Sequence, residues 1–70
     1  MKPFQVAWTV AASNFVLSRH QTKQLAIAAI ERRVRRMSKA TEAGQKPQCF
    51  CYTVQRADGR PAGYERGGWA

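Results

Sequence analysis

"RHQTKQLAIAAIERRVRRMSKA", residues 19–40, contains no glycine or proline and is rich in alanine, arginine, lysine and glutamine. These residue types are good helix formers. Its apolar residues recur at helical spacing and draw one stripe: Ala26, Ile27, Ile30, Val34 and Met37. Ser18 and Gln21 have the spacing of an N-terminal capping box, and Gly44 and Pro47 supply stop signals. The sequence therefore predicts one long amphipathic helix over residues 19–40.

A strand is predicted before this helix, over residues 4–11, where the side chains alternate in character. One face of that strand is fully apolar: Phe4, Val6, Trp8 and Val10. The segment ASN at 12–14 breaks the pattern, and the apolar residues 15–17 are expected to form a link into the helix.

A hairpin is predicted after the helix. Residues 48–56 alternate again, with Phe50, Tyr52 and Val54 on one side. Asp58-Gly59 is the strongest short signal for a two-residue hairpin turn, and residues 61–66 are expected to return as a short third strand. The last residues, GGWA, are expected to form a loose tail.

The resulting order is β-α-β-β, which makes the chain an α+β protein. We expect a three-stranded sheet with the long amphipathic helix packed on one face, in a single small basic domain over residues 1–70. The central core residues are predicted to be Trp8, Ile27, Ile30, Val34, Phe50 and Tyr52. Because proline donates no backbone hydrogen bond, Pro61 favours an edge position for the third strand. The strand over 48–56 is then central, and the strand over 4–11 is expected beside it in parallel, through a right-handed helical crossover.

The charge is the unusual feature of the composition. Twelve lysines and arginines stand against four acidic residues, which gives a formal net charge of +8. Such a field attracts phosphate backbones, anionic membranes or acidic protein faces. No stretch approaches the roughly 20 apolar residues needed to cross a bilayer, and the spacing of Cys49 and Cys51 does not suit a disulfide framework. We therefore expect a cytoplasmic protein without a membrane partner.

The helix carries the densest part of this charge, in the segment ERRVRR at 31–36. At about 100° per residue, four cations lie opposite the apolar stripe: Arg32, Arg35, Arg36 and Lys39. Arg33 lies on the flank, and Glu31 is placed for an i,i+4 ion pair with Arg35. The candidate binding surface is completed by residues of the hairpin: Arg56, Arg60, Tyr64 and Arg66. The alternative is that the charged side is only a solvated face that keeps a small domain soluble.

No catalytic residue, metal ligand set or cofactor is predicted. Cys49, Cys51 and His20 supply at most three zinc ligands, at a spacing that matches structural zinc sites poorly. A cysteine nucleophile paired with His20 has few acidic residues to orient the imidazole. We expect the two thiols to pack as small, half-buried apolar groups, and the protein to be non-enzymatic.

Two functions remain open. In the first, a basic module binds the nucleic acid backbone, or a nucleic-acid-handling nucleoprotein complex, by nonspecific phosphate contacts. In the second, an interaction module inhibits a larger complex by occupying an acidic protein surface. A chain this small also gains stability by pairing with a copy of itself, so a homodimer is compatible with either function.

In general build, the chain resembles the small phage-encoded inhibitors of bacterial defence, anti-CRISPR proteins among them. The resemblance is carried by the strand over 4–11, the helix up to Ala40 and the Asp58-Gly59 hairpin, so it is an architectural likeness over the whole chain. It implies a single domain with a sheet and one helix that blocks a nucleic-acid-handling complex by occupying its surface. It carries over no site residues, because the sequence contains no diagnostic motif of such inhibitors.

Overall fold

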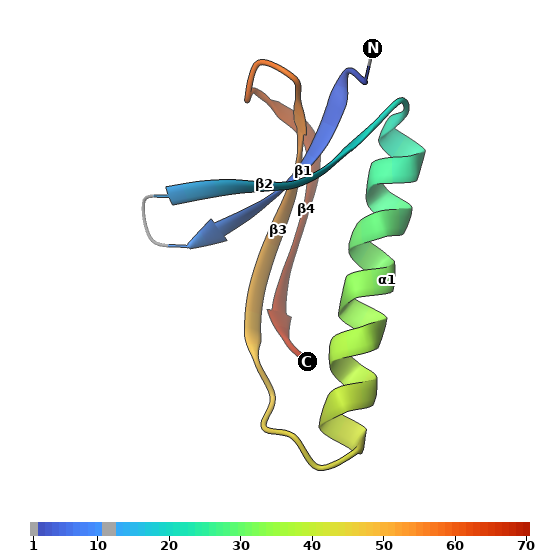
Figure 1. The fold of residues 1–70 in the computed structure, drawn as a ribbon. Coiled ribbons are helices and arrows are strands. Elements are labelled where there is room, and N and C mark those ends of the chain that lie inside the picture. Colours follow the sequence, from blue (N-terminus) through green and yellow to red (C-terminus); the bar gives the residue numbers. More distant parts are fainter. Residues whose placement is uncertain (1, 11–12) are drawn as a thin grey trace.

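The computed structural model describes residues 2–10 and 13–70, and the side chain of Val10 lies outside the described part. The elements in chain order are β1 (Phe4–Val10), β2 (Ser13–His20), α1 (Lys23–Glu42), β3 (Cys49–Arg56) and β4 (Pro61–Trp69). The strands form one sheet in the order β2-β1-β3-β4, and every neighbouring pair is antiparallel. The helix α1 lies along one face of this twisted sheet, and the far ends of β1 and β2 project away from it (Figure 1).

The prediction of a three-stranded sheet is wrong, because the expected link before the helix is itself a strand, β2. Its three consecutive apolar residues, Phe15, Val16 and Leu17, do not alternate as strand residues usually do. The register between β1 and β2 shifts between Val6 and Ala7, which leaves Leu17 as the extra residue of a β-bulge. The bulge lets Leu17 pack against the core while Val16 remains exposed.

The extra strand also changes the direction of β1 relative to β3. The predicted parallel pairing is wrong: the two strands are antiparallel, with Val6 opposite Val54. When a helix follows a single strand, the strand after the helix runs parallel to that first strand. When a helix follows a hairpin, the strand after the helix runs antiparallel to the first strand of the hairpin. Two parts of the predicted order are confirmed, because β3 lies inside the sheet and β4, which starts at Pro61, is an edge strand.

The helix α1 starts at Lys23, later than predicted, because its N-cap is Thr22 and not Ser18. The backbone of Thr22 is extended, and its Oγ1 accepts a hydrogen bond at 3.1 Å from the backbone N–H three residues further on. After the last turn, Gly44 has a φ of 106°, the left-handed conformation that commonly follows a helix. The predicted stop at this glycine is therefore confirmed. Within the described residues, no helix is both long and apolar enough to cross a membrane.

The core lies between α1 and the sheet. Its largest fully buried side chains are Ile30 from the helix and Val6 and Val54 from two neighbouring strands. Among the described side chains, the buried residues that pack together in it are Val6, Ala26, Ala29, Ile30, Val34, Phe50, Tyr52 and Val54. One helix face and one sheet face thus supply the whole cluster, as expected for a two-layer domain.

Four of the six residues predicted for the centre of the core are confirmed: Ile30, Val34, Phe50 and Tyr52. Ile27 is only partly buried. Trp8 lies outside the buried cluster and is 39% exposed, because the twist of the sheet carries this end of β1 away from the helix. Its ring lies instead near that of Phe15, with 6.0 Å between the ring centroids.

The connection between β3 and β4 is longer than the two-residue turn predicted. The N–H of Arg56 donates to the carbonyl of Arg60 at 2.8 Å, so the loop comprises Ala57–Gly59. The N–H of Gly59 closes the turn on the carbonyl of Arg56, and its φ of 89° is a left-handed value that glycine adopts without strain. The strand β4 continues to Trp69, so the last residues are not the loose tail expected.

The sheet face away from α1 holds a buried polar contact. Gln5 and Gln55 lie opposite each other on β1 and β3, and both are buried. Gln5 Nε2 donates to Gln55 Oε1 at 2.9 Å, and Arg19 Nη1 donates from β2 to Gln5 Oε1 at 3.3 Å. Arg19 is therefore tied into the sheet and is separate from the cations of the helix.

Ile30→Ala should lower the free energy of unfolding by about 2–5 kcal/mol, because it opens a cavity beside Val6 and Val54. Denaturant unfolding followed by circular dichroism measures the loss. Leu25→Ala on the same helix is the control: Leu25 is 52% exposed. Its truncation should change stability by only about 0.5 kcal/mol. Equal losses in the two variants would show that the helix faces the sheet with a different side.

Candidate functional site

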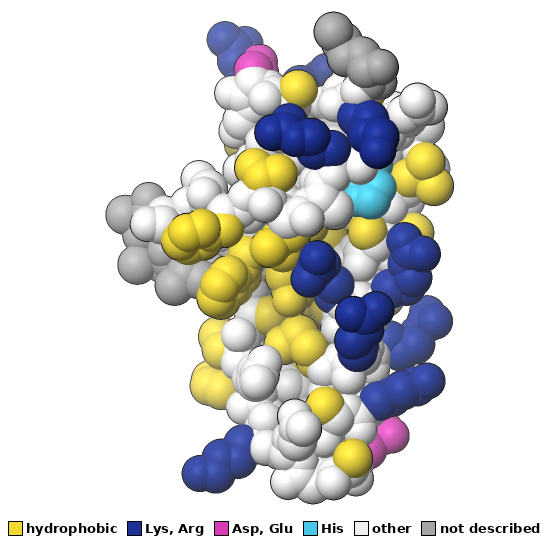
Figure 2. All heavy atoms as spheres, in the orientation of Figure 1, with side chains coloured by type: hydrophobic (Ala, Val, Ile, Leu, Met, Phe, Trp, Pro, Cys, Tyr) yellow, Lys and Arg dark blue, Asp and Glu magenta, His cyan; other side chains and the backbone are white. Residues whose placement is uncertain are grey.

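The outer side of α1 carries a row of cations. Within the described part of the chain, a shallow depression of about 200 Å³ is lined by four side chains, all exposed and all cationic: Arg32, Arg35, Arg36 and Lys39. Arg32, Arg35 and Lys39 lie opposite the buried stripe of the helix, as their spacing predicts, whereas Arg36 lies on the flank beside Ala29. Figure 2 shows lysine and arginine side chains gathered along this side of the molecule. We call these four residues the cation row; together they attract a polyanion.

Glu31 is the only acid in the segment 31–36, and it faces β4 rather than the cation row. Its Oε1 accepts a hydrogen bond from the Tyr64 hydroxyl at 2.7 Å and lies 3.4 Å from Nε of Arg66. The hydrogen bond raises the pKa of the Tyr64 hydroxyl, and burial raises it further. The predicted ion pair of Glu31 with Arg35 is therefore wrong, because the ion partner of Glu31 is Arg66. Tyr64 and Arg66, both predicted for the binding surface, thus form intramolecular contacts with Glu31.

Arg56 and Arg60 lie at the end of β3 and just after the β3–β4 turn, which is at the top of Figure 1. Arg60 forms an exposed ion pair with Asp58, with 3.6 Å between Nε and Oδ2. The cation row lies on the second half of α1, so the structure does not bring these two arginines into it. The predicted binding surface therefore separates into a helix part and a hairpin part.

A second depression, of about 230 Å³, lies between β2 and α1. The residues that line it are Ser18 and His20 from β2 and Ala29, Arg32, Arg33 and Arg36 from α1. His20 Nε2 lies 2.8 Å from Ser18 Oγ. Burial lowers the pKa of His20, and the charges of Lys2 and Arg32 lower it further, so the imidazole is mainly neutral at neutral pH.

The sequence did not reveal this second depression, because it depends on β2. A helix that begins near residue 18 places Ser18 and His20 on its own surface, far from any strand. The signal that points to the depression is their two-residue spacing, which puts both side chains on one face of an extended segment.

A third depression is an open cleft of about 350 Å³ between the β1–β2 hairpin, the start of β3 and the second half of α1. It is lined by Trp8, Leu17, Arg33, Met37, Gln48, Cys49, Phe50 and Tyr52. The cleft exists because β1 and β2 turn away from the helix at this end of the sheet (Figure 1). Hydrophobic side chains gather between the hairpin and the helix in Figure 2.

Aromatic rings form much of this cleft. The rings of Phe50 and Tyr52 are stacked on β3, with 5.6 Å between their centroids. The Tyr52 hydroxyl donates to Sδ of Met37 at 3.6 Å, which ties the strand to the helix at the base of the cleft. Trp8 adds a partly exposed ring from the hairpin, and Phe15 lies beside Trp8 outside the cleft lining. The sequence did not identify these residues as a site, because alternation marks them only as core.

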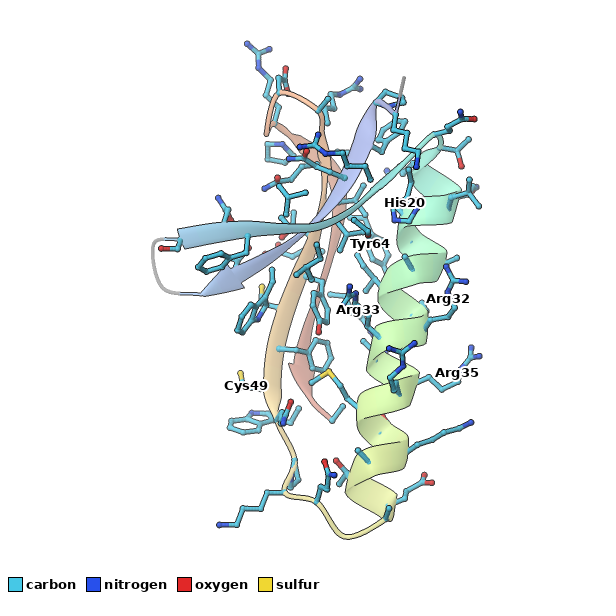
Figure 3. The ribbon with its side chains drawn as sticks, in the orientation of Figure 1. His20, Arg32, Arg33, Arg35, Cys49 and Tyr64 are labelled. Carbon is cyan, nitrogen blue, oxygen red and sulfur yellow. The ribbon has the colours of Figure 1, made fainter. Side chains whose placement is uncertain are left out.

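The three depressions adjoin one another. Arg33 lines both the cleft and the second depression, and Arg36 lines both the second depression and the cation row. At about 100° per residue, the five cations follow one another around the helix in the order Arg35, Lys39, Arg32, Arg36, Arg33. Figure 3 shows Arg32 and Arg35 on the outer side and Arg33 toward the cleft. We call this series of five side chains the basic path.

The cysteines and the histidine form no joint site. Among the residues that the structure describes, no three His, Cys, Asp or Glu side chains come together to hold a metal ion. Cys49 and Cys51 are free thiols, the first exposed and the second partly buried, so only Cys51 is packed as expected. Burial and the neighbouring Glu65 raise the pKa of the Cys51 thiol. A thiol that stays protonated is a poor nucleophile.

His20 is the single histidine, so its imidazole can be followed by NMR through a pH titration. We expect a pKa below 6.5, and Arg32→Gln should raise it by removing a nearby positive charge. Because the folded pKa is lowered, the unfolded chain binds the proton more tightly. The contribution of neutral His20 to the free energy of unfolding is therefore present above pH 6.5 and is lost as the pH falls through the folded pKa. A measured pKa at or above 6.5 would contradict the partial burial of His20.

Comparison with protein-family profiles, curated proteins and solved structures finds no match to this chain. The two surface features that suit a ligand are the cation row on α1 and the aromatic cleft that the basic path enters.

Proposed function

We propose that this protein is a non-enzymatic module that binds the phosphate backbone of nucleic acid, free or within a nucleic-acid-handling complex. The observation that carries the proposal is the depression lined only by the cation row. Phosphates repeat along a nucleic acid strand, so a linear series of cations on a rigid helix can contact several of them at once. The net charge of +8 adds a long-range attraction that brings such a ligand to the surface.

The residue types in the cation row suit phosphate. Three of the four are arginines, and the planar guanidinium binds two phosphate oxygens at once. The only acid of the segment, Glu31, has its charge compensated by Arg66 on the β4 side. Phosphate contacts carry no base information, so the binding that we propose is independent of sequence. A cytoplasmic location suits the free thiols of Cys49 and Cys51.

A second candidate function is inhibition of a larger complex by covering an acidic protein surface, which is the role implied by the resemblance to anti-CRISPR proteins inferred from the sequence. The observation that favours it is the exposure of large apolar side chains, among them Trp69 at 73%. Aromatic residues and arginines are the usual anchors of protein interfaces. A partner that is a second copy of this chain must use another face, because two cation rows repel each other.

Replacing Arg32, Arg35 and Arg36 together with glutamate should abolish binding to an oligonucleotide, measured by fluorescence anisotropy. The fold should persist, because all three side chains are exposed. We expect a destabilisation of at most about 1 kcal/mol per site from the helix dipole. Circular dichroism of the variant checks that the helix is retained. A folded variant with full affinity would show that the cation row is only a solvated face.

The matched control reverses three exposed cations away from the row, Lys2, Arg56 and Arg60, and so has the same net charge as the test variant. It should keep most of the affinity, because none of these three residues belongs to the cation row. An equal loss in both variants would mean that only the net charge matters, which contradicts a defined surface.

The salt dependence of wild-type binding separates the two candidate functions. Affinity for nucleic acid should fall with a log–log slope of roughly 0.7–0.9 for each phosphate contacted. A protein partner that survives nuclease treatment and binds with a shallow salt dependence would favour the second candidate, because its interface includes apolar contacts.

A further inference from the structure

We infer that the nucleic acid is single-stranded, and that an unpaired base enters the cleft beside Trp8 while the phosphates follow the basic path. This inference rests on the proposed function, which concerns phosphate contacts alone. It adds a second contact of different chemistry, between the flat face of a base and the aromatic side chains of the cleft.

The continuity of the surface is the first argument. The cation row, the second depression and the cleft share lining residues in turn, with Arg36 joining the first two and Arg33 the last two. A ligand that extends along this surface therefore meets charge at one end and apolar rings at the other. Each nucleotide of a single strand carries both groups, a phosphate and a base.

The chemistry of the cleft is the second argument. Its volume of about 350 Å³ lies near the lower end of the range for sites that hold small organic groups. The ring of Trp8 is large, apolar and 39% exposed, and its neighbour Phe15 is 52% exposed. Aromatic side chains of this kind stack on bases of any identity. At the rim, Gln48 and Arg33 supply hydrogen-bond donors that match the polar edge of a base.

The alternatives fit less of the surface. In a duplex the bases are paired and stacked, so only the cation row contacts the ligand and the cleft stays empty. An acidic amphipathic peptide can place an apolar side chain in the cleft. However, the cation row offers such a peptide no apolar surface, because all four of its lining residues are cations. A single strand carries one negative charge per nucleotide for the cation row and one base per nucleotide for the cleft, so it matches both surfaces.

Trp8 itself reports on the cleft. The chain has two tryptophans, so Trp69→Phe leaves Trp8 as the only indole fluorophore. Trp69 lies outside the cleft lining, and this variant should bind as the wild type does. We would titrate it with four probes of equal length: a deoxythymidine strand, a uridine strand, an abasic deoxyribose-phosphate strand and a duplex. The first two should quench Trp8, whereas the abasic strand and the duplex should bind without quenching.

Trp8→Ala provides the second measurement. It should lower the affinity for the deoxythymidine strand roughly five- to 140-fold, the range for one lost stacking contact. The affinity for the abasic strand and the salt slope should not change, because the phosphate contacts remain. Trp8 lies outside the buried cluster, so the variant should fold. If it does not fold, the comparison of the four probes on the Trp69→Phe protein decides the question alone.

Three outcomes overturn the inference. Equal affinity for the deoxythymidine strand, the abasic strand and the duplex, with unchanged Trp8 fluorescence, removes the base contact but leaves the proposed function intact. Absence of binding to all four probes refutes both the base contact and the proposed function. Quenching of Trp8 by a synthetic acidic amphipathic peptide that the deoxythymidine strand does not displace identifies the cleft as a protein-binding groove.

Discussion

Ile30 of α1 packs with Val6 and Val54 of the sheet, and these three are the largest fully buried side chains among the residues that the structure describes. In a small domain this contact fixes the rotation of the helix about its axis. Once Ile30 points at the sheet, the cation row must point away from it, and Arg33 must lie at the boundary. The same rotation turns Glu31 toward Tyr64 and Arg66. The charge pattern of the surface is therefore a consequence of how the core packs.

The twist of the sheet supplies the second part of the candidate site. The bulge at Leu17 lets that residue reach the core although β2 has three apolar residues in a row. Beyond the bulge, β1 and β2 turn away from α1 and leave the aromatic cleft open (Figure 1). Trp8 contributes less to the core as a result, but its exposed ring becomes available to a ligand. At this end of the β1–β2 hairpin, Trp8 is therefore less buried, and the cleft lies open beside Arg33.

The sequence predicted those features that depend on local periodicity. The helix, its buried stripe and its cationic side follow from a 3.6-residue repeat, and β3 and β4 follow from alternation and the turn at Gly59. The strand β2 was not predictable in this way, because a bulge interrupts its alternation. Strand direction, the cleft and the partner of Glu31 depend on how distant segments meet, which no local pattern contains. Of the residues predicted for the binding surface, the helix cations lie together, whereas Tyr64 and Arg66 contact Glu31 on the β4 side.

NMR of the arginine side chains shows directly whether the basic path binds a nucleic acid strand, because each Nε–H group reports on its own surroundings. The protein would be titrated with a deoxythymidine strand while the Nε–H signals and the Trp8 indole N–H signal are followed. We expect large shifts for Arg32, Arg33 and Arg36 and for Trp8, with Arg60 unchanged in its ion pair with Asp58. Shifts concentrated on Arg56 and Arg60, with the helix arginines unchanged, would contradict it.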